Sequence, residues 1–282
     1  DRLFFFGSLS PRLEKLKRNY VASDGKSVTV PRDRKTLSTF GKVTYTPTSR
    51  LQLNGSALWT PDKATGKPVA YDGALPNSST SSSEGLIARQ TLGFEVPQWN
   101  MAYTADYTLT DSTVISVRGG YMKDNYYDTG VNTSQTFEYA TSAVGLAGVP
   151  GQWAQPAGFS NLPRTQINDH DITTRQSMDL TVVQTASAAG EHQFKGGFGF
   201  IRNTNDVELA YPNDGYVTVF WNQTFISDVP GVGAGRGTYG YYQIDDIGTK
   251  GKTAANILSL FVQDNWLVTP RLTMNLGVRV ES

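Results

Sequence analysis

The chain has 282 residues, and its 25 basic and 25 acidic side chains give a formal net charge of zero, which argues against a nucleic-acid-binding protein. Apolar residues make up 38% of the chain and no run approaches the roughly 18 apolar residues of a membrane-spanning helix, so a helical membrane protein is excluded. Cysteine is absent, which excludes disulfides and thiolate sites, and an aromatic content of 11% is too high for a disordered chain.

An alternation of apolar and polar side chains recurs along the chain, as in strands with one apolar face. In chain order the alternating runs lie near 3–6, 43–45, 51–59, 99–109, 115–121, 178–182, 194–200, 258–268 and 272–280. The last run is the clearest, because Leu272, Met274, Leu276 and Val278 share one face, which we expect to contact lipid. Asn275 and Arg279 then face the lumen. We predict about nine antiparallel strands of roughly ten residues or more, long enough to cross a bilayer when tilted.

The connections between the expected strands alternate between short and long. Tight turns are expected near 47–50, 110–112, 187–191 and 268–271, and long loops over 11–35, 60–97, 128–172 and 203–253. Short periplasmic turns and long extracellular loops are the plan of an outer-membrane barrel, and a soluble sandwich has no reason to separate its loops in this way. We therefore predict an all-β, antiparallel transmembrane β-barrel. The serine-rich stretch 77–83 and the glycine-rich stretch 231–237 should lie in water.

Aromatic residues are expected near strand ends, where a transmembrane barrel carries an aromatic girdle at each membrane interface. The residues concerned are Phe4, Phe5, Phe6, Trp59, Trp99, Tyr107, Tyr121 and Trp266. An ordinary β-sheet core is also rich in aromatic residues, so this spacing alone favours the girdles only modestly.

Three segments resemble one family of outer-membrane proteins. The run from Asp1 to Ser8 resembles the DKLFFFGS strand of Oar-like TonB-dependent receptors, and His192 to Gly197 is similar to their HxFKxG segment. The run from Leu260 to Trp266, followed by Arg271 to Arg279, resembles their LFVQDxW…RLTLNLGVRYE hairpin, with Val280 where the family usually has Tyr. The three segments occur in the family's order from one end of the chain to the other.

The resemblance implies an energy-coupled importer in the bacterial outer membrane, with a barrel of about 22 strands around a plug. Residues 1–282 would then be an internal part of one barrel domain, since both ends of the sequence look cut. The plug, the TonB-contacting segment and a carboxypeptidase-regulatory-like domain would lie outside this chain. Membrane lipid, lipopolysaccharide and TonB, through the plug, are the expected partners. A structural or adhesive barrel that displays loops without transport is the alternative, and a secreted all-β glycan-binding module is a third possibility.

Catalytic and metal-binding patterns are scarce. His170 lies in the triplet Asp169-His170-Asp171 of an expected loop, where such a histidine is far more often solvated than bound to a metal. His192 falls at an expected turn, and the run from Ser23 to Lys26 matches S-x-x-K only by composition. We therefore expect no enzyme, no metal site and no cofactor.

The loop 203–253 contains the best candidate ligand site. Its aromatic and acidic residues are Trp221, Tyr239, Tyr241, Tyr242, Asp245 and Asp246, near Phe225. Aromatic rings with polar tips recur in binding surfaces, although packing of the loop against itself is the slightly favoured alternative. Because only Arg236, Lys250 and Lys252 are at hand, an oligosaccharide or a peptide suits the loop better than an anionic iron chelate.

Overall fold

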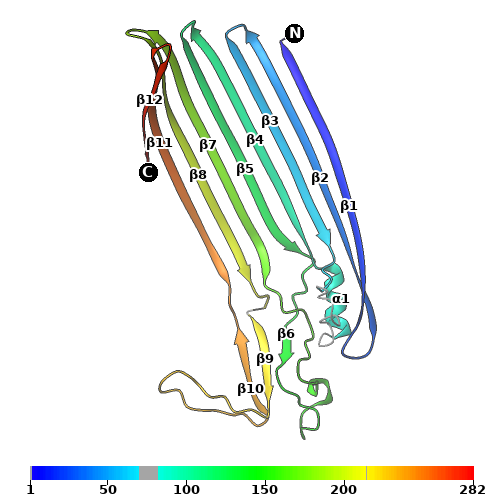
Figure 1. The fold of residues 1–282 in the computed structure, drawn as a ribbon. Helices are drawn as coiled ribbons and strands as arrows, with labels where there is room; N and C mark the ends of the chain where they lie inside the picture. Colours follow the sequence, from blue (N-terminus) through cyan, green and yellow to red (C-terminus); the bar gives the residue numbers. More distant parts are fainter. Residues whose placement is uncertain (1, 70–81, 214) are drawn as a thin grey trace.

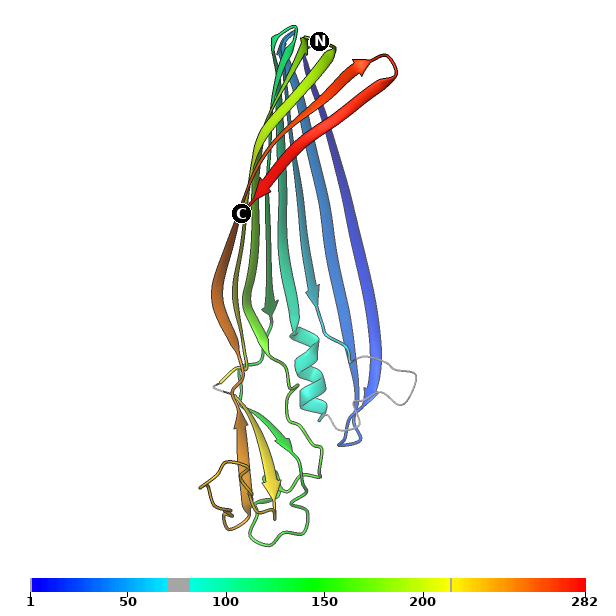
Figure 2. The ribbon, with the colours of Figure 1, turned by 60° about the vertical axis from the view of Figure 1, so that its left-hand side comes forward.

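The computed structural model describes residues 2–69, 82–213 and 215–282 and is dominated by one large antiparallel sheet (Figure 1). The sheet has nine strands in the order β1-β2-β3-β4-β5-β7-β8-β11-β12, so within this sheet each strand pairs with the one that follows it in the sequence. A second sheet of three strands, β10-β9-β6, lies beyond the ends of the first (Figures 1 and 2). The expectation of about nine strands in an all-β antiparallel fold is confirmed.

The large sheet is built from strands of 10 to 22 residues. Its strands are β1 (Leu3–Val21), β2 (Ser27–Thr48), β3 (Leu51–Thr65), β4 (Gly93–Thr110), β5 (Thr113–Thr129), β7 (Ile167–Ser187), β8 (Glu191–Ala210), β11 (Thr249–Thr269) and β12 (Leu272–Glu281). The connections contain α1 (Ser83–Thr91), β6 (Thr136–Tyr139), a 3₁₀ turn η1 (Gly151–Trp153), β9 (Tyr216–Trp221) and β10 (Gly240–Asp245).

All four expected tight turns lie at one end of the large sheet, at the top of Figure 1. At the opposite end, the connections 66–92, 130–166 and 211–248 are long, as expected. The predicted loop 11–35 is wrong, because β1 and β2 run through most of it and leave only residues 22–26 as a turn. The other three long loops are also shorter than predicted, because the strands on either side extend further.

The loop boundaries were misplaced because apolar alternation marks only part of each strand. Beyond Leu13 on β1 and Leu37 on β2 the side chains are largely charged or polar on both faces, yet backbone pairing continues to Val21 and Ser27. Alternation needs one face in an apolar environment, whereas backbone pairing does not. For the same reason Trp59 and Trp99 lie well inside their strands rather than at the strand ends.

The two faces of the large sheet differ in chemistry. We call the face on which α1 packs the inner face and the opposite one the outer face. On the outer face Val117, Leu180, Phe198 and Leu260 lie directly opposite one another across four strands. The inner face carries polar chains of hydrogen bonds instead.

One inner-face chain of hydrogen bonds crosses three strands. The Thr44 hydroxyl donates to Asn54 Oδ1 at 2.8 Å, and Asn54 Nδ2 donates to Thr104 Oγ1 at 3.1 Å. Such side chains suit a wet lumen, and the apolar outer face suits lipid.

Helix α1 covers the inner face at the tips of β1 and β2, as Figure 2 shows. Ser82 caps the helix by accepting a hydrogen bond from the Gly85 amide at 2.9 Å, and Leu86 is fully buried against Tyr20, Val28 and Val30. The serine-rich stretch was expected in water, but Ser82 and Ser83 are buried, because the helix start docks against the neighbouring turn. Residues 77–81 of that stretch lie outside the described residues. In the described parts of the chain no helix is long and apolar enough to span a membrane.

Candidate functional site

The small sheet is formed by two of the long connections. Strands β9 and β10 form an antiparallel hairpin within 211–248, and β6 from 130–166 pairs parallel to β9. The sequence of β9, Tyr-Val-Thr-Val-Phe-Trp, is β-branched and aromatic, which favours a strand. Its register places Val217, Val219 and Trp221 on one face, together with Phe137 of β6 and Tyr242 of β10.

This face forms one wall of an open groove with a volume of about 740 Å³. The second wall comes from the segment around η1, and the residues from 238 to 242 close one side. The lining residues are Gln135, Phe137, Val149, Pro150, Trp153, Val217, Val219, Trp221, Thr238, Tyr239, Gly240, Tyr241 and Tyr242. The groove is therefore mainly apolar and aromatic, with hydroxyl and amide groups among its polar atoms.

Aromatic contacts fix two of the rings that line the groove, Trp221 and Phe137. Tyr139 stacks on Trp221 with a centroid separation of 6.3 Å, and Phe137 meets Trp153 edge to face at 5.4 Å. Burial raises the pKa of the Tyr139 phenol, so this hydroxyl stays neutral. The indole Nε1 of Trp221 is buried and has no hydrogen-bond partner among the described residues. A fixed array of aromatic rings along an open groove is suited to binding a ligand.

The predicted aromatic residues divide between two sides of the hairpin. Trp221, Tyr239 and Tyr242 line the groove, and Tyr242 is 67% exposed. Tyr241 borders the groove, but its ring stacks on Phe220 at 4.5 Å and meets Phe225 at 5.5 Å. Successive residues of a strand point to opposite faces, which explains why neighbouring tyrosines differ in their surroundings.

The two predicted acidic residues lie outside the groove. Asp245 forms an ion pair with Arg164 at 3.4 Å and accepts a hydrogen bond from Gln243 Nε2 at 2.8 Å. The Arg164 guanidinium also lies 4.3 Å from the centre of the Tyr216 ring. Asp245 therefore fastens the hairpin to the segment that precedes β7, and Asp246 is exposed beside it.

Sequence reasoning missed half of the groove. Phe137, Val149, Pro150 and Trp153 come from the connection 130–166, which was expected only as a solvated loop. A tryptophan in a loop rich in glycine and proline was the available signal. That β6 pairs with β9 was not visible in the sequence, because the pairing is parallel and joins segments about 80 residues apart.

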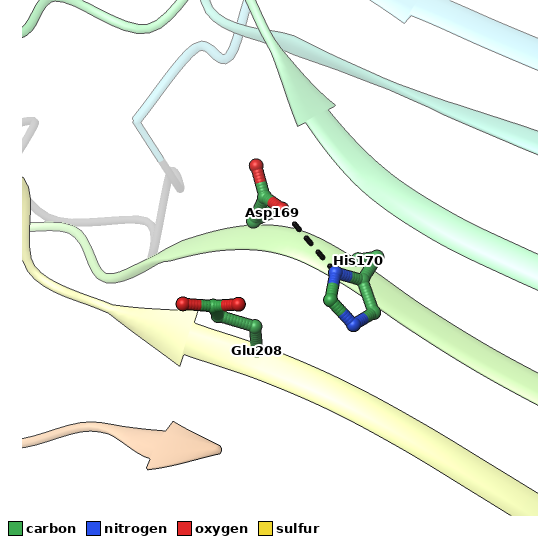
Figure 3. Close-up of side chains that lie close together, drawn as sticks. All are labelled: Asp169, His170 and Glu208. Carbon is green, nitrogen blue, oxygen red and sulfur yellow. Dashed lines mark hydrogen bonds and ion pairs between the residues drawn. The ribbon is translucent and has the colours of Figure 1, made fainter. Parts of the chain in front are cut away.

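Asp169, His170 and Glu208 also lie together, at the far ends of β7 and β8 (Figure 3). A bulge between Asn168 and His170 turns the Asp169 carboxylate toward His170 Nδ1, at 3.2 Å. The prediction of a solvated loop was wrong here, because His170 is half-buried within β7. Glu208 is also paired with Lys250 at 2.6 Å, and His170 Nε2 lies 3.4 Å from Asp206 Oδ1.

The family to which the chain belongs is shown by a match over its whole length. A family profile described as an outer membrane beta barrel domain matches residues 1–282. The chain belongs to this family. A comparison with curated proteins gives no match.

Similar solved structures include an outer membrane transporter and two receptors. The outer membrane transporter YddB from Escherichia coli superposes with a TM-score of 0.56 at 13% identity, over 99% of this chain and 32% of that one. The ferric enterobactin receptor PfeA from Pseudomonas aeruginosa, as a mutant, gives 0.49 at 12% identity, over 100% of this chain and 35% of that one. The ferripyoverdine receptor of the same organism gives 0.48 at 15%, over 99% and 36%. The chain thus spans about a third of the length of these proteins.

Membership of the outer membrane beta barrel family places the large sheet in the bacterial outer membrane. Its short turns then face the periplasm and its long connections the cell surface, with the outer face toward lipid and the inner face toward the lumen. A secreted glycan-binding module is excluded. The groove of the small sheet lies on the cell-surface side.

Proposed function

We propose that this chain is part of the barrel of a TonB-dependent importer of the Oar-like kind, and that the groove of the small sheet captures its ligand at the cell surface. The groove carries the proposal, because it is a concave, aromatic site formed by two cell-surface connections on a rigid barrel. The likeness of the fold to an outer membrane transporter and the three family-like segments support the assignment.

The chemistry of the groove favours an oligosaccharide or a peptide. Aromatic rings bind the apolar faces of sugars and peptide side chains, and their polar tips supply hydrogen bonds. None of the described lining residues is basic, whereas an anionic iron chelate would call for Arg or Lys. The exposed Tyr242 and the ring of Trp221, both of which line the groove, are the groups that we expect to contact the ligand.

Import also needs parts that lie outside these residues. A plug would close the lumen beneath the groove, and TonB would pull on the plug to admit the bound ligand. A barrel that only displays its loops would hold the same groove without coupling to energy. The two functions therefore share the binding step and differ in whether the bound ligand crosses the membrane.

Binding is tested on cells that carry the full protein, with labelled oligosaccharide and oligopeptide libraries as probes. Tyr242→Ala should lower binding about tenfold, as expected for an exposed aromatic contact. Ile247→Ala is the matched control, because Ile247 is 65% exposed and lies outside the groove. If Tyr242→Ala binds the probes as well as Ile247→Ala and the wild type do, the groove is not the site of capture.

Transport is tested with the ligand that binding identifies. Accumulation in the periplasm should stop when TonB is deleted or the proton gradient is dissipated, while binding at the surface persists. Accumulation that is insensitive to both treatments would contradict an energy-coupled importer. Binding without any accumulation would favour the display function.

A further inference from the structure

The strand lysines on the cell-surface side lie on one face of the large sheet. On the outer face, beyond the apolar residues, the sheet carries Lys15, Lys17, Lys35, Lys63, Lys123, Lys250 and Lys252, which we call the lysine belt. The belt thus extends over β1, β2, β3, β5 and β11.

The strand register places the belt directly above the lipid-facing surface. Lys35 lies opposite Leu13 on one side and Lys63 on the other, so all three side chains share the outer face. Lys63 follows Trp59 by four residues and Lys123 follows Tyr121 by two, which keeps each lysine on the same face as the aromatic residue before it. The belt therefore begins where the apolar surface ends.

Lysines and arginines are largely separated between the two faces. Beyond the apolar part of the strands the inner face carries Arg12, Arg18, Arg32, Arg34 and Arg175, whose register partners are inner-face residues. Arg202 is an exception, because it lies on the outer face opposite Gln176. Nearer the short turns, the strand lysines Lys42 and Lys195 also lie on the inner face. Snorkelling of long basic side chains would bring strand lysines to both membrane interfaces. On the described strands of this sheet, lysines lie on the lipid-facing side only near the cell surface.

Acidic partners neutralise only part of the belt. Lys63 pairs with Glu95, and Lys250 and Lys252 pair with Glu208 and Asp206 at 2.6 and 3.0 Å. Lys15, Lys17, Lys35 and Lys123 form no ion pair within the described residues, although Asp33 lies opposite Lys15 in the register.

Lys35 and Lys63 lie directly opposite each other on β2 and β3, so two positive charges meet on the outer face. Like charges directly opposite each other on one face of a sheet are destabilising. Glu95 already offsets the charge of Lys63, so Lys35 is the member of the pair that an external anion would neutralise. Both side chains are exposed, so a group from the surrounding membrane can reach them.

We propose that the lysine belt binds the phosphate groups of lipopolysaccharide in the outer leaflet. Ammonium groups at the boundary between the apolar surface and water attract anionic headgroups, and each contributes to retention of the lipid. The belt faces sideways into the membrane plane rather than into the lumen, which suits a neighbouring lipid and not a transported ligand. Its extension over several strands fits a row of lipid headgroups better than a single free phosphate.

The test uses the full protein, purified in detergent and titrated with lipopolysaccharide, with enzymatically dephosphorylated lipopolysaccharide and with inorganic phosphate. Lys15→Gln/Lys35→Gln should weaken binding of intact lipopolysaccharide about 30-fold, at roughly fivefold per lysine. The matched control is Arg12→Gln/Arg32→Gln, which removes the same charge from the inner face of the same two strands. It should change binding by less than about twofold.

Each outcome decides for or against the belt. Equal losses in the two variants, or equally tight binding of the dephosphorylated lipid, would overturn the proposal. Displacement of the lipid by millimolar inorganic phosphate would assign the lysines to free phosphate instead. If the Gln variant fails to assemble, Lys15→Arg/Lys35→Arg decides, since it keeps the charge and should retain binding. Binding to the groove should be unchanged throughout, which separates this proposal from the proposed function.

Discussion

Trp59 and Trp99 lie directly opposite each other on β3 and β4, and their rings stack with a centroid separation of 5.5 Å and an interplanar angle of 23°. Both lie on the outer face. Along β4, Tyr107 occupies the same face near the short turn, about eight residues or roughly 26 Å away. Allowing for a strand tilt of about 40°, this approaches the ~25 Å apolar band that separates two aromatic girdles.

The stacked pair should couple energetically. In a double-mutant cycle with Trp59→Leu and Trp99→Leu, we expect a coupling energy of about 0.5–1.5 kcal/mol in favour of the native pair. The free energy of unfolding of the full protein in lipid vesicles is the quantity to measure. Trp59→Leu combined with Trp266→Leu is the control, because Trp266 lies on β11 near a different turn. A coupling as large in the control pair would show that the effect is not local.

The assignment of the faces is tested by adding a charge. Leu260→Arg should destabilise the barrel by about 2–4 kcal/mol, since Leu260 is on the outer face amid Phe198 and Val280. Asn275→Arg on the inner face, opposite Asn265, should have a much smaller effect. Leu276 is a poorer test site, because Asp264 lies opposite it and would partner an introduced arginine. Refolding titrations into vesicles measure both variants. Equal effects would mean that the register is shifted by one residue.

Helix α1 offers two neighbouring aliphatic positions with opposite surroundings. Leu86→Ala should lower the free energy of local opening of the helix by about 2–5 kcal/mol, because Leu86 is fully buried against Tyr20 and Val30. Ile87→Ala should change little, since Ile87 is 50% exposed. Amide hydrogen exchange within residues 83–91 reports this local opening, which the global stability of the barrel would hide. Similar exchange rates in the two variants would contradict the docked position of the helix.

The start of α1 is also fastened to the β1–β2 turn by Asp24. The Ser83 hydroxyl donates to Asp24 Oδ2 at 2.7 Å, and this hydrogen bond, aided by Lys26, lowers the pKa of the Asp24 carboxyl. A lowered folded-state pKa stabilises the docked helix above the ordinary aspartate pKa, and this stabilisation disappears as the pH falls through the folded-state value.

A fluorophore on a cysteine introduced by Glu84→Cys should therefore gain mobility as the pH falls below about 4. With Ser83→Ala in the same background the transition should move to higher pH, because the main cause of the lowered pKa is gone. A transition at the same pH in both proteins would show that the contact does not hold the helix.

The sequence was sufficient for the membrane-embedded part of the fold. Lipid on one face and water on the other impose a two-residue period, so the strands around Leu180, Leu260 and Val278 could be predicted, and with them the short turns. Where both faces are wet, as around Lys15 and Arg34, the period vanishes although the strands continue. The loop 11–35 was therefore predicted where a strand pair exists.

The candidate site could be predicted only in part, for a different reason. Trp221, Tyr239 and Tyr242 were found because aromatic residues concentrate in one connection. Trp153 and Phe137 were not, because their contact with this hairpin depends on long-range pairing of β6 with β9. Asp245 was grouped with these aromatic residues because it lies in the same connection, and its ion pair with Arg164, 81 residues earlier, was not visible in the sequence.

The segment before η1 approaches residues 238–242 at Gly148, whose backbone lies close to the Tyr239 side chain. A Cβ atom at Gly148 would lie 2.6 Å from the Tyr239 hydroxyl, and the residue has a φ of +84°. Gly148→Ala therefore combines a steric clash with backbone strain. We expect it to separate the η1 segment from residues 238–242 and to lower the free energy of local unfolding there by about 1–3 kcal/mol.

Gly145→Ala is the matched control. Gly145 has a φ of +82° and nothing within 4 Å of the added atom, so the two variants share the backbone strain but not the clash. Amide hydrogen exchange of Gly240–Asp245 measures the loss, and binding of the labelled libraries should fall in parallel. If Gly145→Ala accelerates exchange in β10 as much as Gly148→Ala does, the contact between Gly148 and Tyr239 does not hold the groove together.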